Sequence, residues 1–243
     1  MLSKNELKYI QSLCQKKQRV QEGLFLAEGP KLAQEIFSSD YRVEKLYATA
    51  EWISENSVNI DVTEVTEMEL SKMSSLQTPN EVLMVCRQKI LKDEPVFKKT
   101  ISIILDGLQD PGNMGTIIRI ADWFGIKQII ASEDTVEFYN PKVIQSTMGS
   151  FIRVKCWYRN LNEVLSAAKV PVYGALLNGK SINKTTALKE GILVIGNESK
   201  GIRESLMPLI SEAITIPRIG KAESLNAAVA TGILLSHLCG KTD

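Results

Sequence analysis

Three polar, glycine-containing segments each follow an apolar run that is typical of a buried strand. They span residues 105–126, 192–202 and 214–235. Their side chains include amides, a carboxylate, a hydroxyl and a guanidinium, which together could bind an anion, orient a hydroxyl group and stabilise negative charge that develops in a reaction. The side chains that we single out are Asn113, Arg119, Glu198, Ser224 and Asn226.

The first segment predicts a strand, a tight turn and a helix. Pro111-Gly112 and Gly115 favour the turn. Asn113 is expected to cap the helix that carries Arg119 among apolar neighbours, so this charge requires a partner. A helix N-terminus with free amides can receive a phosphate, but a capped turn without a ligand explains the segment equally well. The pattern is neither a P-loop nor a dinucleotide fingerprint.

The second and third segments predict loops at the ends of two further strands. In the second, two glycines bracket Asn197 and Glu198, which would offer backbone amides and carbonyls to a flat heterocycle. In the third, Ser224 is expected to cap a final helix from residue 224 to about 238, which would place Asn226 in its first turn. A capping role alone is the plainer interpretation of Ser224.

Strands and helices alternate along the whole chain, which indicates an α/β protein. Residues 1–90 predict a small α/β domain, residues 91–100 a charged linker, and residues 101–243 a larger domain. In the larger domain, six apolar runs predict a parallel sheet covered on both faces: ISIIL, QIIAS, VKCWY, VYGALL, ILVIG and AITIP. Ligands of such sheets bind at the carboxyl ends of the strands, where the three polar segments begin.

The composition, 44% hydrophobic and 23% charged over 243 residues, is that of a globular chain with one or two cores. No run of about 18 apolar residues predicts a membrane span, and the N-terminal residues do not resemble a secretory signal. We therefore expect a cytoplasmic protein without a membrane partner.

The four cysteines lie far apart, so neither a disulfide nor a metal site is expected, and most of them should be buried. Trp123 and Phe124 are expected in the core, and His237 in the core or at an interface.

The net charge of +1 does not by itself indicate a nucleic-acid partner. Two S/T-x-x-E patterns, at Ser3 and at Thr66, predict helices that begin with capping boxes. Positive charge is concentrated around the first of these helices: Lys4, Lys8, Lys16, Lys17 and Arg19. A solvated helix face explains this pattern, and a contact with RNA is the alternative.

The order of the motifs is more specific than any one segment. The chain contains N-x-G-x-x-x-R, then G-N-E-x-x-G about 75 residues later, then I-P followed by S-L-N. In this order they resemble the three motifs of the SpoU (TrmH-like) RNA ribose methyltransferases of the SPOUT superfamily. The runs FLAEGPKLAQEI and NPKVIQSTMGSFIRV resemble the family's N-terminal RNA-binding domain and a segment of its catalytic domain.

This resemblance implies a fold and an activity. The fold is a C-terminal α/β knot domain, with a deep trefoil knot and a parallel sheet, after a smaller N-terminal α/β RNA-binding domain. The activity is transfer of a methyl group from S-adenosylmethionine to a ribose 2′-hydroxyl in RNA, by a homodimer and without a metal. Structured RNA is the expected partner, rRNA in preference to tRNA. Asn80-Glu81 and Ala227-Ala228 depart from the family pattern and leave the target nucleotide open.

The resemblance also assigns residues. It implies a catalytic constellation of Asn113, Arg119, Glu198, Ser224 and Asn226 and a cofactor pocket of Gly196, Ile216 and Leu225. Relatives are often assigned an arginine general base, but a guanidinium stays protonated and is a poor base. We therefore expect Arg119 to bind the target phosphate and stabilise the developing alkoxide. Asn113 and Glu198 are expected to orient Arg119 and the ribose, and Ser224 and Asn226 to fix the loop and the nucleotide.

Two other classes of function stay open at this point. A catalytically silent RNA-binding protein could retain the fold, although the intact catalytic set argues against it and affinity for S-adenosylmethionine would decide. A Rossmann-type oxidoreductase or nucleotide-binding enzyme lacks its fingerprint, and binding of NAD without S-adenosylmethionine would restore it. Aromatic residues make up only 6% of the chain, which disfavours a stacking platform for single-stranded nucleic acid.

Overall fold

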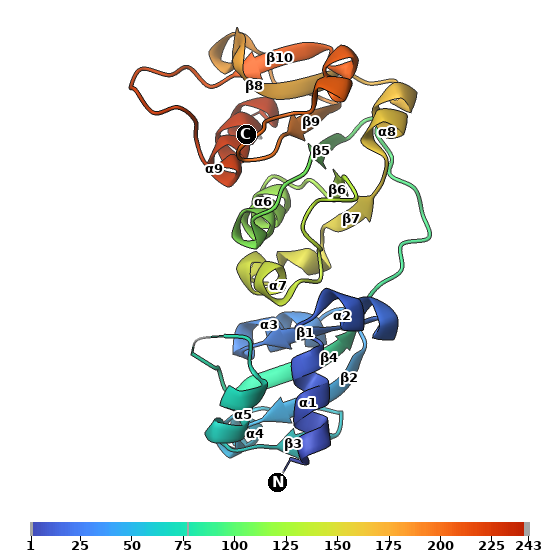
Figure 1. Ribbon diagram of the computed structural model, residues 1–243, viewed down its shortest axis with the longest axis vertical. Coiled ribbons are helices and arrows are strands. Elements are labelled where there is room, and N and C mark those ends of the chain that lie inside the picture. Colours follow the sequence, from blue (N-terminus) through green and yellow to red (C-terminus); the bar gives the residue numbers. More distant parts are fainter. Residues whose placement is uncertain (1, 77, 241–243) are drawn as a thin grey trace. The chain divides into compact units, whose positions relative to one another are not determined.

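The computed structural model describes residues 2–76 and 78–240 and contains two compact units (Figure 1). The N-terminal unit comprises residues 1–90 and 137–152, and the C-terminal unit comprises residues 91–136 and 153–243. The predicted boundary at residues 91–100 stays a prediction. The contacts add that residues 137–152 group with the N-terminal unit.

A four-stranded sheet lies at the centre of the N-terminal unit, in the order β1-β4-β2-β3. The strands are β1 (Leu24–Glu28), β2 (Val43–Ala48), β3 (Val62–Glu64) and β4 (Val82–Arg87). β4 pairs antiparallel with β1 and β2, and β3 pairs parallel with β2. The helices are α1 (Lys4–Ser12), α2 (Lys16–Glu22), α3 (Pro30–Phe37), α4 (Ala50–Glu55) and α5 (Glu67–Met73). Ile10, Leu70 and Leu83 belong to a buried cluster that packs α1 and α5 on the sheet.

Two helix starts show how tertiary contacts compete with local sequence. At α5, Thr66 and Glu69 form the predicted reciprocal capping box. At α1, Ser3 accepts a hydrogen bond from the amide of Glu6, but the Glu6 carboxylate accepts one from the Tyr47 hydroxyl instead of closing the box. The capping box predicted at Ser3 is therefore only half formed.

Residues 137–152 complete the N-terminal unit. They contain α7 (Pro141–Thr147) and the 3-10 helix η1 (Ser150–Ile152). Arg19 of α2 is 1% exposed and its guanidinium donates to the carboxylate of Glu137. Phe25 packs against Tyr139 and Phe151, with ring centroids 4.7 and 5.8 Å apart. Arg19, expected among the exposed basic residues, is thus a buried anchor for this segment.

A six-stranded sheet forms the centre of the C-terminal unit, in the order β10-β8-β9-β5-β6-β7, and every pair is parallel. The strands are β5 (Ile101–Leu105), β6 (Gln128–Ala131), β7 (Lys155–Tyr158), β8 (Val172–Ser181), β9 (Gly191–Ile195) and β10 (Glu212–Thr215). The helices are α6 (Pro111–Trp123), α8 (Leu161–Ala167) and α9 (Ala227–Leu238), with 3-10 helices η2 (Ile182–Lys184) and η3 (Glu204–Leu209). All six predicted strands are present, and the predicted parallel α/β sheet is confirmed.

The central strands of this sheet are buried on both faces. Ile104 and Val194 belong to the buried cluster that includes α8 and η3. Ile103 and Leu193, which alternate with them and point to the opposite face, are equally buried. Continuous apolar runs are therefore required here, since neither face meets water.

The segment predicted as a linker is tied to the edge strand β7 and its neighbour. The carbonyl of Asp93 accepts a hydrogen bond from Trp157 Nε1 at 2.8 Å, and the Asp93 carboxylate pairs with Lys155 at 2.6 Å. The side chain of Gln128 donates to the Val96 carbonyl at 2.7 Å and accepts from the Val96 amide at 3.1 Å. The segment is therefore held against β6 and β7 through side chains of both strands.

Several expectations about burial are wrong. Trp123 is 85% exposed, and His237 is exposed near the end of α9, so His237 is not a core residue and its place at an interface stays a prediction. Of the four cysteines only Cys86 is buried, and Cys14 is exposed. No helix in the described part of the chain is long and apolar enough to cross a membrane.

Candidate active site

The first two polar segments leave the carboxyl ends of β5 and β9, which are neighbours in the sheet. The third leads into α9, which packs against α6. The turn after β5 depends on Gly107, whose φ of +70° lies in the left-handed region. Gly112 and Gly115, which we expected in this turn, lie inside α6. That expectation is wrong because the chain turns before Pro111 begins the helix.

Asp110 caps α6. Its Oδ1 accepts a hydrogen bond from the Asn113 amide at 2.7 Å, and Pro111 occupies the first helical position. Asn113 is the third residue of the helix, so the prediction that Asn113 is the N-cap is wrong. The Asp-Pro pair is the sequence signal that could have identified the true cap.

The Glu198 carboxylate joins the loop after β9 to the start of α6. Its Oε1 accepts from Asn113 Nδ2 at 3.0 Å and from the Asp110 amide at 3.3 Å, and its Oε2 accepts from the Gln109 amide at 3.4 Å. Burial acts to raise the pKa of Glu198, but the hydrogen bonds outweigh it and hold this pKa below its usual range. Glu198 is therefore ionised at neutral pH and a poor acceptor for a substrate proton.

A second link connects α6 to α9. Asn226 Nδ2 donates to Asn113 Oδ1 at 2.8 Å, while Asn226 Oδ1 accepts from the amides of Ala228 and Val229 at 3.0 and 3.2 Å and caps α9. Because donors and acceptors alternate along Glu198, Asn113 and Asn226, the orientation of both amide groups is determined. We call these three residues the amide chain.

Ser224 does not cap the final helix. The helix begins at Ala227, and Ser224 lies exposed in the preceding loop. The prediction of a capping role is wrong because Asn226 performs it. Within residues 2–76 and 78–240, no hydrogen bond involves the Ser224 hydroxyl.

Arg119 is exposed on α6. We expected an apolar helix to require a partner for this charge, but the guanidinium makes no hydrogen bond or ion pair with the described residues. At 100° per residue, Arg119 shares the exposed side of α6 with Thr116 and Trp123. Its charge is solvated and available to an external anion.

The three residues expected to hold a cofactor lie in the same two loops. A Cβ on Gly196 would lie 2.2 Å from the carbonyl carbon of Gly201, so the chain's own packing requires a glycine there. Ile216 is half-buried, and Leu225 is 48% exposed. Apolar side chains and loop backbone groups of this kind can hold a flat heterocycle such as adenine, and the assignment of these three residues to a cofactor stays a prediction.

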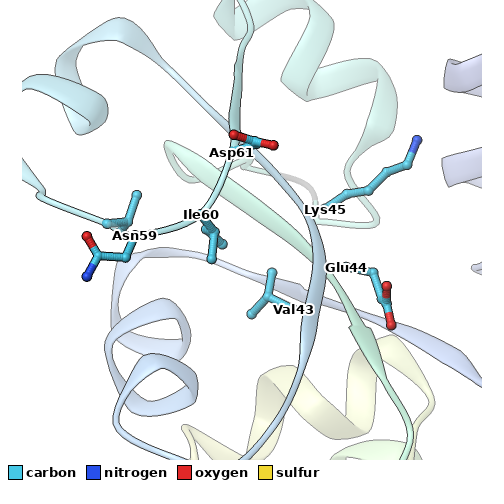
Figure 2. Close-up of a pocket in the computed structure, with 7 residues that line it drawn as sticks. Val43, Glu44, Lys45, Asn59, Ile60 and Asp61 are labelled. Atoms are coloured by element: carbon cyan, nitrogen blue, oxygen red, sulfur yellow. The ribbon is translucent and has the colours of Figure 1, made fainter.

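The described residues contain no cluster of three or more His, Cys, Asp or Glu side chains that could hold a metal ion. A cavity of about 570 Å³ lies within the N-terminal unit and is lined by Val43, Glu44, Lys45, Val58, Asn59, Ile60 and Asp61. Figure 2 shows the side chains of Glu44 and Lys45 extending away from Ile60. Both are engaged within the unit, Lys45 with Glu6 and Glu44 with Arg87. Of the charged residues that line this cavity, only Asp61 has no ion pair among the described residues.

Comparison with known protein families discriminates between the remaining classes of function. The model of the SpoU rRNA methylase family matches residues 100–236, and that of the MRM3-like substrate-binding domain matches residues 4–84. The chain belongs to the SpoU rRNA methylase family. A curated relative, the 23S rRNA (guanosine(2553)-2′-O)-methyltransferase RlmP of Bacillus subtilis, is 32% identical over 231 residues, which are 93% of this chain and 92% of the relative.

Two solved structures of SpoU-type proteins match nearly the whole chain. One, described as an RNA methyltransferase of the TrmH family from Porphyromonas gingivalis, is 36% identical, with a TM-score of 0.86 over 98% of each chain. The other, an S-adenosylmethionine-bound rRNA methyltransferase from Sinorhizobium meliloti, is 30% identical, with a TM-score of 0.85 over 97% of this chain and 95% of that chain. The SpoU fold is thereby confirmed, and the oxidoreductase alternative has no support.

Proposed function

We propose that this SpoU-family chain transfers the methyl group of S-adenosylmethionine to a ribose 2′-hydroxyl in ribosomal RNA. The observation that carries the proposal is the amide chain, which joins the loops of all three motifs at the start of α6, the helix that also carries the solvated Arg119. An arrangement that fixes three loops and keeps one cation unpaired is suited to a substrate that brings its own negative charge.

S-adenosylmethionine supplies an electrophilic methyl group on a sulfonium, which leaves as a neutral thioether. This chain has to hold the 2′-hydroxyl oxygen in line with that methyl group. As the oxygen–methyl bond forms and the sulfur–methyl bond breaks, the hydroxyl proton passes to water. Orientation of this kind can contribute about 7 kcal/mol when it is ideal. The amide chain supports it because rigid loops hold the reacting groups at fixed positions.

Arg119 binds the phosphate next to the target ribose and stabilises the alkoxide that develops. A guanidinium presents a planar fork of donors that matches phosphate oxygens, and it keeps its charge. The Ser224 hydroxyl and the remaining N–H of Asn226 fix the nucleotide. Gly196, Ile216 and Leu225 hold the adenosine, largely through backbone groups.

The N-terminal unit binds structured RNA through its exposed lysines. Lys4 and Lys8 of α1 and Lys16 and Lys17 of α2 are exposed and make no ion pair among the described residues. The match of residues 4–84 to a substrate-binding domain supports this role. Such contacts read shape and backbone rather than base sequence.

The catalytic unit forms a homodimer through α6 and α9. Trp123 of α6 is 85% exposed and Val229 of α9 is 51% exposed, and α9 has apolar residues on all sides. A helix that is apolar all round belongs in a buried position, and an exposed tryptophan is the side chain most enriched in interface hot spots. A second copy of this face is the partner that would cover it.

We include the trefoil knot in the proposal. The amide of Leu188, in the connection from β8 to β9, donates to the carbonyl of Leu238 at the end of α9 at 2.7 Å. A Cβ on Gly240 would lie 2.9 Å from the Cβ of Ala187. The end of the chain thus packs against an earlier connection, as a threaded terminus requires. We place the protein in the cytoplasm, without a membrane partner.

The test is methylation of RNA by the purified full chain. We would incubate it with S-adenosylmethionine labelled in the methyl group and either rRNA or tRNA that lacks modifications, and then map the labelled nucleotide. The expected result is label on one ribose of rRNA, absent with Arg119→Ala.

Each other outcome selects an alternative. Label only in tRNA identifies a tRNA ribose methyltransferase. Tight RNA binding without affinity for S-adenosylmethionine identifies a non-catalytic RNA-binding protein. Label on a base rather than on a ribose overturns the proposal.

A further inference from the structure

Asp106, directly after β5, carries a carboxylate that is fully buried at the edge of the site loops. Burial raises the pKa of Asp106 from its ordinary value. A buried carboxylate needs a cation or several donors. Here Arg203, eight residues after the end of β9, provides the cation and one donor: its Nε forms an ion pair with Asp106 Oδ1 at 3.0 Å, and its backbone amide donates to Asp106 Oδ2 at 2.8 Å.

The same guanidinium reaches the loop after β6. Arg203 donates from one terminal nitrogen to both oxygens of Asp134, at 2.6 Å to Oδ2. This hydrogen bond holds the pKa of the Asp134 carboxyl below its usual range, and Ser132 assists by donating to Asp134 at 2.7 Å. One side chain therefore joins the ends of β9, β5 and β6, three consecutive strands of the sheet.

The loops that Arg203 joins also support the amide chain, through the turn at residues 107–110. Asn197 Nδ2 donates to the Gly107 carbonyl at 2.7 Å, and Gln109 Nε2 donates to the carbonyls of Asp134 and Gly107 at 2.6 and 3.2 Å. The backbone amide of Gln109 donates to the Glu198 carboxylate. The path from Arg203 to Glu198 thus runs through polar contacts on both sides of the residue 107–110 turn.

Apolar packing anchors these loops at Leu108 and Ile202, which are 0% and 7% exposed. The neighbouring residues lack such an anchor: Glu198, Ser199 and Lys200 are exposed, as are Gln109 and Asp110. Exposed loop segments open at low cost in free energy unless polar contacts restrain them. The ion pair of Arg203 is the contact that includes a fully buried carboxylate, that of Asp106.

We propose that Arg203, together with Asp106 and Asp134, is a positioning unit for the catalytic groups: it sets the distance between the Glu198 loop and the start of α6, and so the orientation of Asn113. The inference rests on the proposed function and assigns residues that none of the three motifs includes. Arg203 acts through Glu198 and does not touch the substrate.

Substitution of Arg203 should lower turnover without weakening RNA binding. Displacement of a reacting group by about 1 Å costs about 100-fold in rate. For Arg203→Met we expect kcat to fall about 30- to 100-fold while the KM for RNA stays within about twofold of wild type. Arg203→Lys keeps the ion pair with Asp106 but loses the second donor arm, so it should recover part of kcat. Glu204→Gln, the exposed neighbour, is the matched control and should retain wild-type kcat.

Loss of Arg203 leaves a buried carboxylate without its cation, which by itself destabilises a protein. The double variant Arg203→Met/Asp106→Asn removes that charge and separates unfolding from mispositioning. It should regain the wild-type unfolding temperature but not the wild-type kcat. Recovery of both the unfolding temperature and kcat would show that Arg203 only neutralises the charge of Asp106, and this result would overturn the inference.

Amide hydrogen exchange provides a readout that needs no activity. The amides of Gln109 and Asp110 donate to Glu198, and they should exchange at least 10-fold faster in the double variant than in wild type or Glu204→Gln. Unchanged protection of these two amides overturns the positioning role even if the wild-type protein does not methylate RNA. An inactive wild-type protein with the expected exchange overturns the proposed function alone.

Discussion

The Arg119 side chain is exposed to solvent and is available to bind a substrate. Replacement by lysine retains the charge but removes the planar fork that matches phosphate oxygens. We predict that Arg119→Lys lowers kcat by about 100-fold, with no change in the unfolding temperature, because no contact with the described residues is lost. Single-turnover methylation and thermal unfolding measure the two effects. Wild-type turnover in Arg119→Lys would exclude both a base and a phosphate-binding role.

Glu198 should make stability depend on pH in the acid range. The pKa of Glu198 is lower in the folded state than in the unfolded state. Its contribution to the free energy of unfolding is therefore present above the unfolded-state pKa of about 4.3, and it is lost as the pH falls through the folded-state pKa. We predict that Glu198→Gln unfolds about 2 °C below wild type at pH 7, and that this difference shrinks between pH 5 and pH 3. Thermal unfolding at each pH is the measurement. Glu133→Gln is the control, because Glu133 is exposed and makes no hydrogen bond or ion pair with the described residues. If the difference in unfolding temperature between Glu198→Gln and wild type grows as the pH falls, the prediction is wrong.

Side-chain chemistry alone did not determine which residue caps a helix. Asp, Asn and Ser share the short acceptor that capping needs, so Asn113 and Ser224 were as suitable as Asp110 and Asn226. The choice depends on where the backbone leaves the extended region, and this is fixed by packing of α6 and α9 on the sheet. Motif order did select three residues that the structure joins by hydrogen bonds, Glu198, Asn113 and Asn226, because spacing in sequence records a constraint that a single side chain does not.

At the scale of elements, Asn226 caps α9 and also links it to α6. Asn226→Asp keeps the capping oxygen but places a carboxylate against Asn113 Oδ1, so Asn113 must lose a bond to Asn226 or to Glu198. We predict that Asn226→Asp retains stability and loses turnover at least 10-fold, whereas Asn226→Ala also loses about 1 kcal/mol of unfolding free energy. Equal turnover in Asn226→Asp and wild type, measured with saturating RNA, would remove the amide chain from the mechanism.

The loop after β9 should be sensitive to a single methyl group. A Cβ on Gly196 meets backbone atoms at 2.2 to 2.6 Å, which no side-chain movement can relieve. We predict that Gly196→Ala abolishes detectable S-adenosylmethionine binding in calorimetry. Gly220→Ala, whose Cβ meets nothing within 4 Å, should bind as wild type does. Normal binding by Gly196→Ala would show that the loop is not the cofactor's support.

The elements themselves were largely predictable. Strands such as β5 and β9 are buried on both faces, so each is a continuous apolar run that sequence alone identifies. The sequence did not predict the turn at Gly107, nor that residues 137–152 pack in the N-terminal unit. Both depend on contacts between residues far apart in the chain. Arg19 shows this most clearly, since its charge predicts an exposed position and only the carboxylate of Glu137 makes burial possible.

At the scale of the whole molecule, Trp123 should determine the oligomeric state. We predict that Trp123→Glu weakens the homodimer at least 30-fold, the effect of about 2 kcal/mol that is typical of an interface tryptophan. The unfolding temperature of the monomer should not change, because the side chain is exposed. Sedimentation equilibrium measures the dissociation constant, with Lys127→Glu as a charged control on the same unit. A wild-type monomer at micromolar concentration would refute the proposed interface.

The course of residues 137–152 through the N-terminal unit has a consequence for how the protein is made. A ribosome releases residues 1–90 well before residue 137, so for that interval Arg19 has no carboxylate partner and Phe25 lacks Tyr139 and Phe151. Residues 1–90 therefore stay incompletely packed until a segment encoded after β6 has been made. A gene fragment cut at residue 90 would keep them in that state permanently, and a self-sufficient N-terminal unit requires residues 137–152 to be joined to it.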